Sequence, residues 1–192
     1  MTIPDILQKV KDAGHSIFEK GEWNLNIIGV RSNDTSSNTY NDKLYVVCKD
    51  EFGNWVNICF QITTDPGAYW LKNPSRVDGT AILVPGQYRS VWKIDKHQGR
   101  YDALCQRNGK VKVYRDSNAD TILDMDSSSI SEGWFGINIH RSNSRTESTL
   151  VEKWSAGCQV FSNPKEFDIF MSFCRISSTL YGNKFSYTLI EE

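Results

Sequence analysis

The chain has 192 residues, of which 39 % are apolar and 12 % aromatic. This length and composition suit one domain with its own hydrophobic core and argue against intrinsic disorder. The 22 Lys and Arg residues nearly balance the 23 Asp and Glu residues, and the isoelectric point is near 6.3. A surface that follows nucleic-acid phosphates carries an excess of basic residues, so we expect no nucleic-acid partner.

Two features of the sequence bear on location. No apolar run approaches the ~20 residues that cross a bilayer, so we expect no membrane span. A signal peptide needs an uncharged apolar stretch near its start, whereas this chain has Asp5, Lys9, Lys11 and Asp12 there. We therefore expect synthesis in the cytoplasm without a signal peptide.

Five cysteines are spread along the chain without a CxxC pair, which fits neither a disulfide framework nor a zinc knuckle. We expect most of them to be buried free thiols, with one exception. They are Cys48, Cys59, Cys105, Cys158 and Cys174.

The first predicted element is an amphipathic helix over residues 4–20. Pro4 suits a first helical position, apolar residues then recur at helical spacing, and Gly21 ends the run. We expect this N-terminal segment, residues 1–22, to pack on a single domain formed by residues 23–192.

From Trp23 onward the pattern changes to short runs rich in Val, Ile, Tyr and Trp, which are typical of strands. A helix is predicted over residues 165–177 after Pro164, and a closing strand over 185–191. The fold class predicted is therefore α+β and predominantly β. The other predicted strand runs are 23–31, 43–50, 54–63, 80–92, 101–106, 110–116 and 134–140.

The most informative stretch is residues 136–161. A strand-like run ends at His140, and a polar loop of 14 residues leads to Ser155-Ala156-Gly157-Cys158. A free thiol has a pKa near ~8.5, so an imidazole beside it would generate the nucleophilic thiolate at neutral pH. A glycine before the cysteine lets a substrate carbonyl approach backbone N–H groups. Isolated cysteines are also common as small buried hydrophobic residues, so a catalytic Cys158 and a structural Cys158 both stay open as hypotheses.

This stretch resembles the signature of the L,D-transpeptidase catalytic domain family, in which a histidine precedes a Ser/Thr-His-Gly-Cys string at a similar distance. Pro85-Gly86-Gln87-Tyr88 is similar to the family's Pro-x-Gly-x-Tyr segment, one residue tighter. The resemblance implies a β-rich cysteine acyltransferase fold acting on the peptide stem of peptidoglycan. It also implies Cys158 as nucleophile, His140 as general base, and the amides of Gly157 and Cys158 as an oxyanion hole.

The chain departs from the family pattern at two positions, and these bear on substrate binding. Ala156 stands where the family has a second histidine, and Val160 stands where an arginine or asparagine follows the cysteine. Arg141 follows the histidine and is a candidate carboxylate-binding group. The other candidate substrate-binding residues are Ser155, Trp134, Trp154 and Tyr88. His97 lies between two strand runs beside Gly99, either near the cleft or in a polar turn, and the turn is favoured.

Acidic residues alternate along residues 116–124 in the way that calcium loops space their oxygen ligands. The end of the pattern departs from an EF-hand, because Thr121 and Ser127 stand where glycine and glutamate belong. A structural calcium ion and a carboxylate-rich turn both remain open, and catalysis is expected to require no cofactor. The candidate ligands are Asp116, Asn118, Asp120 and Asp124.

Together these observations predict cysteine-dependent acyl transfer on peptidoglycan stem peptides, with hydrolysis of the endopeptidase or L,D-carboxypeptidase type favoured. Because no export signal is recognised, we expect a phage or a contractile injection system to deliver the protein to the cell wall. The alternative is a non-catalytic structural or wall-binding component of a phage or injection particle that keeps the fold.

Overall fold

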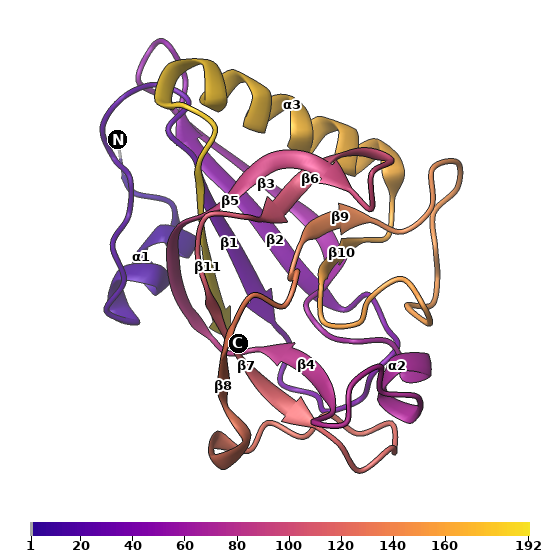
Figure 1. The fold of residues 1–192 in the computed structure, drawn as a ribbon. Coiled ribbons are helices and arrows are strands. Elements are labelled where there is room, and N and C mark those ends of the chain that lie inside the picture. Colours follow the sequence, from indigo (N-terminus) through magenta and orange to yellow (C-terminus); the bar gives the residue numbers. More distant parts are fainter. Residues whose placement is uncertain (1) are drawn as a thin grey trace.

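The computed structural model describes residues 2–192, and its main feature is a closed eight-stranded barrel (Figure 1). The helices are α1 (Asp5–Asp12), α2 (Ala68–Lys72), the 3-10 turn η1 (Ser127–Ser129) and α3 (Pro164–Tyr181). The strands are β1 (Asn26–Arg31), β2 (Asp42–Lys49), β3 (Trp55–Thr63), β4 (Thr80–Leu83), β5 (Gly86–His97), β6 (Tyr101–Gln106), β7 (Val111–Asp116), β8 (Ser131–Gly133), β9 (Ile139–Arg141), β10 (Gln159–Phe161) and β11 (Phe185–Glu191). The expectation of a predominantly β fold with a few helices is confirmed.

The strands follow the order β1-β11-β5-β6-β9-β10-β3-β2 around the barrel. Two of the pairs, β1 with β11 and β9 with β10, are parallel, and the remaining pairs are antiparallel. Strands β4, β7 and β8 form a separate sheet beside α2. Figure 1 shows this sheet at the end of the barrel opposite α3.

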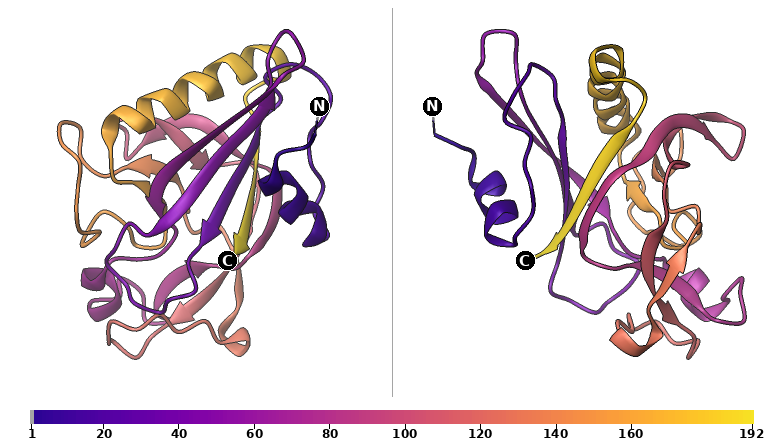
Figure 2. Two further views of the ribbon diagram at one scale, coloured as in Figure 1. Left: turned by 180° about the vertical axis from the view of Figure 1, so that it is seen from behind. Right: turned by 60° about the vertical axis from the view of Figure 1, so that its left-hand side comes forward.

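Alternation along the strands sends apolar side chains to two sides of the barrel wall. On β2, Leu44, Val46 and Cys48 belong to the main core, whereas Val47 lies under α1 with Ile28 of β1. Helix α1 packs there through Ile6, Leu7 and Val10. Figure 2 shows α1 on the outside of the wall that contains β1 and β11.

Helix α3 covers the other side of the barrel with one apolar face. Phe167, Phe170 and Met171 are buried in the main core. The side chain of Asn163 caps the helix by accepting the N–H of Lys165 at 2.9 Å, and Gly182 ends it with a φ of +81°. The predicted helix over 165–177 is therefore confirmed and extends one turn further. Among residues 2–192, no helix is long and apolar enough to cross a membrane.

Besides the strand run 23–31, which begins only at Asn26, three predicted elements are shorter than expected. The helix predicted over 4–20 ends at Asp12, because Gly14 takes a φ of +79° and turns the chain. The run 80–92 divides at Val84 and Pro85 into β4 and β5, which belong to different sheets. Proline lacks the N–H that a continuous strand would donate.

The third shortened element is the run 134–140, of which only residues from Ile139 onward form a strand. The segment before it is held by side chains instead of a strand ladder. The amide oxygen of Gln106 accepts the N–H groups of Phe135 and Ile137, and the indole of Trp92 donates to the carbonyl of Ile137 at 2.7 Å. Satisfied in this way, the buried backbone does not need a neighbouring strand.

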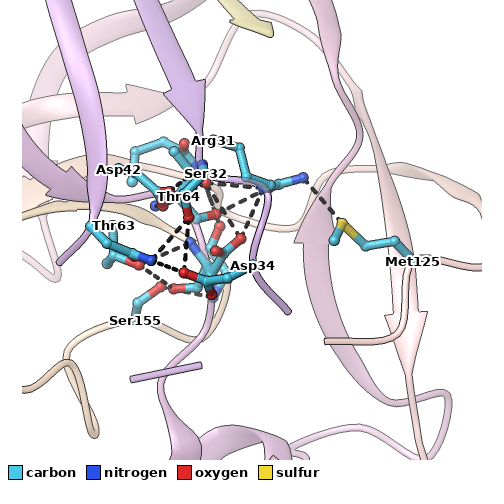
Figure 3. A network of polar contacts seen from close by, with 12 residues as sticks. Arg31, Ser32, Asp34, Asp42, Thr63, Thr64, Met125 and Ser155 are labelled. Carbon is cyan, nitrogen blue, oxygen red and sulfur yellow. Dashed lines mark hydrogen bonds and ion pairs between the residues drawn. The ribbon is translucent and has the colours of Figure 1, made fainter. Parts of the chain in front are cut away.

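A buried polar network lies at the end of β1 (Figure 3). Arg31 is 1 % exposed, and its Nε lies 2.9 Å from Asp65 Oδ1 and 3.0 Å from Thr64 Oγ1. A second buried carboxylate, Asp42, accepts the N–H of Ser32 and both the N–H and the hydroxyl of Thr64. Arg31 thus pairs with one buried carboxylate, Asp65, whereas Asp42 is bound by neutral donors. Burial raises the pKa of Asp65 to about 6, and the opposing effect of Arg31 is smaller.

The acidic segment expected to bind calcium forms the loop after β7. The amide nitrogen of Asn118 donates to Asp120 Oδ2 at 2.9 Å and to Asp124 Oδ2 at 2.7 Å, so these three side chains converge. Asp116 is buried, and its Oδ2 accepts the N–H of Asp124 while Oδ1 has no partner within residues 2–192. As the loop stands, no three His, Cys, Asp or Glu side chains in the described chain converge as a metal site. The calcium ion therefore stays a prediction.

Calcium is predicted to raise the melting temperature. A bound ion would have to displace the Asn118 amide nitrogen from between the two carboxylates and use the side-chain oxygens instead. At ten times its dissociation constant, an ion stabilises by ~1.4 kcal/mol, which is about 3–6 °C for a domain of this size. Calorimetry with excess calcium and with a chelator measures the shift. Asp124→Ala should abolish the shift, and Asp168→Ala on α3 should not. Equal melting temperatures in calcium and in chelator would show that this segment is a carboxylate-rich turn that binds no calcium.

Asp65 should make the free energy of unfolding depend on pH. Its pKa is raised from an ordinary 3.8 to about 6. The protonated carboxyl therefore contributes to the free energy of unfolding, and this contribution is fully present below pH 4 and is lost as the pH rises through 6. The loss amounts to roughly 3 kcal/mol, and Asp65→Asn should remove it. Urea unfolding between pH 4 and 7 measures the slope. The exposed Asp168→Asn serves as control, and an unchanged slope in Asp65→Asn would contradict this assignment.

Candidate functional site

A cavity of about 770 Å³ lies where the β5–β6 turn, the end of β9 and the loop before β10 meet. It brings together His140 and Cys158, the two residues that the sequence predicts as base and nucleophile. Of the candidate binding residues, Arg141 and Trp154 also line it. The other lining residues are Trp70, His97, Gln98, Arg100, Tyr101, Ser142, Asn143, Ser144, Lys153 and Ala156.

His140 lies in the middle of β9 with its ring almost fully buried. Its Nδ1 is 2.8 Å from the carbonyl oxygen of Arg141, which also accepts the hydroxyl of Tyr101 at 3.1 Å. A carbonyl only accepts, so we assign the ring proton to Nδ1 and the lone pair to Nε2. Burial, reinforced by neighbouring His97, lowers the pKa of His140 to about 3. The imidazole is therefore neutral at physiological pH and can accept a proton through Nε2.

His97 lines the cavity, although the sequence favours a polar turn over a place near the cleft. It ends β5, is 8 % exposed, and its ring stacks on His140 with centroids 4.1 Å apart. Its Nδ1 lies 3.0 Å from the side-chain nitrogen of Asn138, and burial lowers its pKa. The two histidines meet because β6 pairs with both β5 and β9. No local signal in the sequence indicates that pairing.

Cys158 is partly exposed and immediately precedes β10. Its sulfur accepts the N–H of Asn138 at 3.4 Å and lies 3.5 Å from the carbonyl oxygen of Gly136. Burial raises the pKa of this thiol to about 11, and the Asn138 hydrogen bond opposes the rise. The resting group is therefore a neutral thiol.

Cys158 and His140 share the cavity, but no hydrogen bond joins them in residues 2–192. Val160 is the register partner of His140 on the parallel strands β9 and β10, so Cys158 is offset from His140 by two residues. The thiol is directed toward the carbonyl of Gly136 instead. Contact with the imidazole requires the thiol to turn away from that carbonyl.

Gly157 is required for packing, because its φ is +113° and a Cβ would lie 2.2 Å from the carbonyl oxygen of Ala81. Its N–H donates to Ser155 Oγ at 3.1 Å, so this amide is engaged within the turn, and its expected role in an oxyanion hole stays a prediction. The N–H of Cys158 donates to no acceptor within residues 2–192. One of the two expected oxyanion donors is therefore available.

Ser155 is fully buried, and its expected contact with substrate stays a prediction. Its hydroxyl donates to the carbonyl of Cys158 at 2.8 Å while accepting the Gly157 N–H. The carbonyl of Ser155 also accepts the N–H of Gly67. Ser155 therefore fixes the conformation of the turn that carries the cysteine.

The remaining candidate binding residues divide between the cavity and other places. Arg141 stacks its guanidinium over the ring of Tyr101 at 4.1 Å, and Trp154 is 43 % exposed on the wall of the cavity. Tyr88 lies outside the cavity, because its hydroxyl donates to the carbonyl of Val84 at 2.7 Å. Trp134 is likewise outside and lines a smaller neighbouring cavity.

All five cysteines are free: Cys158 is partly exposed, Cys59 is exposed, and the others are buried. The expectation that most are buried free thiols is confirmed. The residues of the acidic loop, Asp116 to Asp124, are not among those lining the cavity of Cys158.

Comparison with protein-family models, with curated proteins and with solved structures finds no match to this chain.

Proposed function

We propose that the chain is a cysteine acyltransferase that acts on peptide bonds of the peptidoglycan stem, in the manner of the L,D-transpeptidase-like domains that its sequence resembles. The observation that carries the proposal is the cavity of Cys158. A thiol, an imidazole with a free Nε2 lone pair, and an unengaged N–H of Cys158 line it or adjoin it. These are the nucleophile, base and oxyanion donor that acyl transfer needs.

The resting pair is a neutral thiol and a neutral imidazole, so proton transfer has to accompany attack. The thiol of Cys158 turns toward His140 and gives its proton to Nε2 as sulfur bonds to the substrate carbonyl carbon. The N–H of Cys158 stabilises the oxyanion. When the carbon–nitrogen bond breaks, the imidazolium returns the proton to the departing amine, leaving a thioester on Cys158.

The wall of the cavity favours a peptide that carries negative charge. Its ionisable side chains, apart from the histidines, Tyr101 and Cys158, are Arg100, Arg141 and Lys153. Arg141 is held over Tyr101, so less side-chain freedom is lost when it binds a carboxylate. The indoles of Trp70 and Trp154 offer apolar surface for the peptide backbone and for methyl groups.

Hydrolysis is favoured as the second step. Arg100, Ser144 and Lys153 on the wall of the cavity are exposed, so water reaches the thioester without passing a closed lid. His140 takes a proton from this water as it attacks, the carbon–sulfur bond breaks, and the thiol is restored with release of a carboxylic acid. A transpeptidase would have to exclude water and hold a second peptide at the same place.

The second candidate function is a peptide-binding module without turnover. The observation that favours it is the orientation of the Cys158 thiol, which faces the Gly136 carbonyl with a raised pKa and makes no hydrogen bond to His140 within residues 2–192. In that case the same cavity binds stem peptides and releases them unchanged. Products of an incubation separate the two functions.

We predict that the protein shortens or separates stem peptides when it is incubated with purified muropeptides, and mass spectrometry of the products measures this. Cys158→Ala should abolish the products without changing the melting temperature, because Cys158 lies beside an open cavity. Cys59→Ala, which removes an exposed thiol on β3, is the matched control and should keep full activity. New cross-linked dimers as the main product would assign transpeptidation, and unchanged peptides would support the binding module.

The pH dependence of turnover tests the neutral pair. Burial holds the pKa of His140 near 3 and that of Cys158 near 11, so kcat/KM should be nearly constant between pH 5 and 9. A preformed thiolate–imidazolium pair would instead give a rate that changes within this range. Steady-state rates at constant ionic strength measure the profile, and an acid limb centred near pH 6.5 would contradict the neutral pair.

A further inference from the structure

A second, smaller cavity of about 160 Å³ adjoins the cavity of Cys158. It lies between β4, the end of β7 and the segment that precedes β9, and Trp70 and Ala156 line both cavities. Its wall includes Thr80, Arg115 and Phe135. The two cavities therefore share a wall formed by Trp70 and Ala156, and Ala156 precedes Cys158 by two residues in the sequence.

Arg115 is the unusual residue of this small cavity, because its side chain is 7 % exposed and only partly satisfied. Nε donates to Ser131 Oγ at 3.1 Å and lies 3.4 Å from Asp78 Oδ2, and Nη1 donates to the carbonyl of Gly79 at 3.2 Å. Nη2 is buried and has no hydrogen-bond partner within residues 2–192. Leaving a charged donor unpaired in this way is costly, which suggests that a ligand supplies the missing acceptor.

The rest of the guanidinium is fixed before any ligand arrives. The guanidinium carbon lies 4.5 Å from the centroid of the Phe135 ring, and the contacts of Nε and Nη1 hold the plane in one orientation. Asp78 also pairs with Arg76 at 3.0 Å, so two guanidinium groups face one carboxylate and one positive charge is left over. That excess matches a ligand with a single negative charge.

We infer that this small cavity is a subsite for a carboxylate of the substrate, which Arg115 binds through Nη2. The inference rests on the proposed function and adds a recognition element to it. The shared wall contains Ala156, two residues before Cys158 in the chain. One residue of an extended substrate peptide spans at most ~3.6 Å, so a substrate carboxylate one or two residues from the attacked carbonyl can reach this wall. The substrate is therefore a peptide whose free C-terminal carboxylate lies close to the cleaved bond, as in carboxypeptidase action.

The small side chain of Ala156 is part of this arrangement. Ala156 is exposed and lies in the shared wall, at the position where the resembling family carries a histidine. A larger side chain there would fill space between the nucleophile and Arg115. The departure from the family pattern thus opens a path that a carboxylate-bearing residue can use.

Binding of two peptides to the Cys158→Ala protein tests the subsite, because that protein cannot turn either peptide over. The probes are one stem tetrapeptide as its free acid and as its C-terminal carboxamide, titrated by calorimetry. We expect the free acid to bind about tenfold to a hundredfold more tightly, the range of a charge-assisted hydrogen bond. Equal affinities, or no binding of the free acid at millimolar concentration, would overturn the inference.

Three further variants, each combined with Cys158→Ala, locate the effect. Arg115→Gln should remove the preference for the free acid, and Arg175→Gln on the distant helix α3 is the matched loss of one charge and should keep it. Ala156→Phe should also remove the preference, because the larger side chain would fill the space at the shared wall. This variant replaces Arg115→Gln as the test if Arg115→Gln fails to fold. A preference retained in Ala156→Phe and in a folded Arg115→Gln would overturn the subsite. Turnover by the unmodified protein is scored separately, so failure of the subsite and failure of the proposed function are distinguishable.

Discussion

The buried guanidinium of Arg31 holds together segments that are far apart in the sequence and that all approach the cysteine turn. It donates to the hydroxyl and the carbonyl of Thr64 and pairs with Asp65. The carbonyl of Thr64 also lies 3.4 Å from the side-chain nitrogen of Gln159, the residue after the cysteine. Removing Arg31 would leave the buried carboxylate of Asp65 without its positive partner, which costs about 3–5 kcal/mol.

Gln159 connects this network to the peptide plane between Gly157 and Cys158, which carries the proposed oxyanion donor. Its side-chain nitrogen lies 3.5 Å from the carbonyl of Gly157, and its oxygen accepts the hydroxyl of Tyr187 at 2.8 Å. The carbonyl of Gly157 and the N–H of Cys158 belong to the same planar peptide unit, so fixing one orients the other. A polar cluster inside the barrel thus orients the N–H of Cys158, which has no acceptor within residues 2–192.

Local sequence patterns predict much of this fold, and the parts they miss depend on pairing between distant strands. Period-two alternation and turn residues identify β2, β3, β6, β7 and β11 to within a residue or two. The barrel itself is not visible in the sequence, because closure depends on the parallel pairs β1–β11 and β9–β10. The same limit applies to the site. The sequence selects His140 and Cys158, which line one cavity, by their spacing and by resemblance. The stacking of His97 on His140 and the hydrogen bond from Ser155 to the Cys158 carbonyl depend on contacts that spacing does not predict.

The departure at Val160 has a physical reason in the packing behind the nucleophile. Val160 is fully buried with Tyr40 and Val151, and Cys158 packs against the same cluster. A charged side chain at this position would have to bring its own partner into that cluster, and among these neighbours only the hydroxyl of Tyr40 is polar. An apolar residue instead raises the cost of ionising the adjacent thiol, in keeping with the raised pKa of Cys158. In the mechanism that we propose, the valine therefore favours loss of the thiol proton only during attack, and recognition of substrate charge is assigned to arginines on other segments.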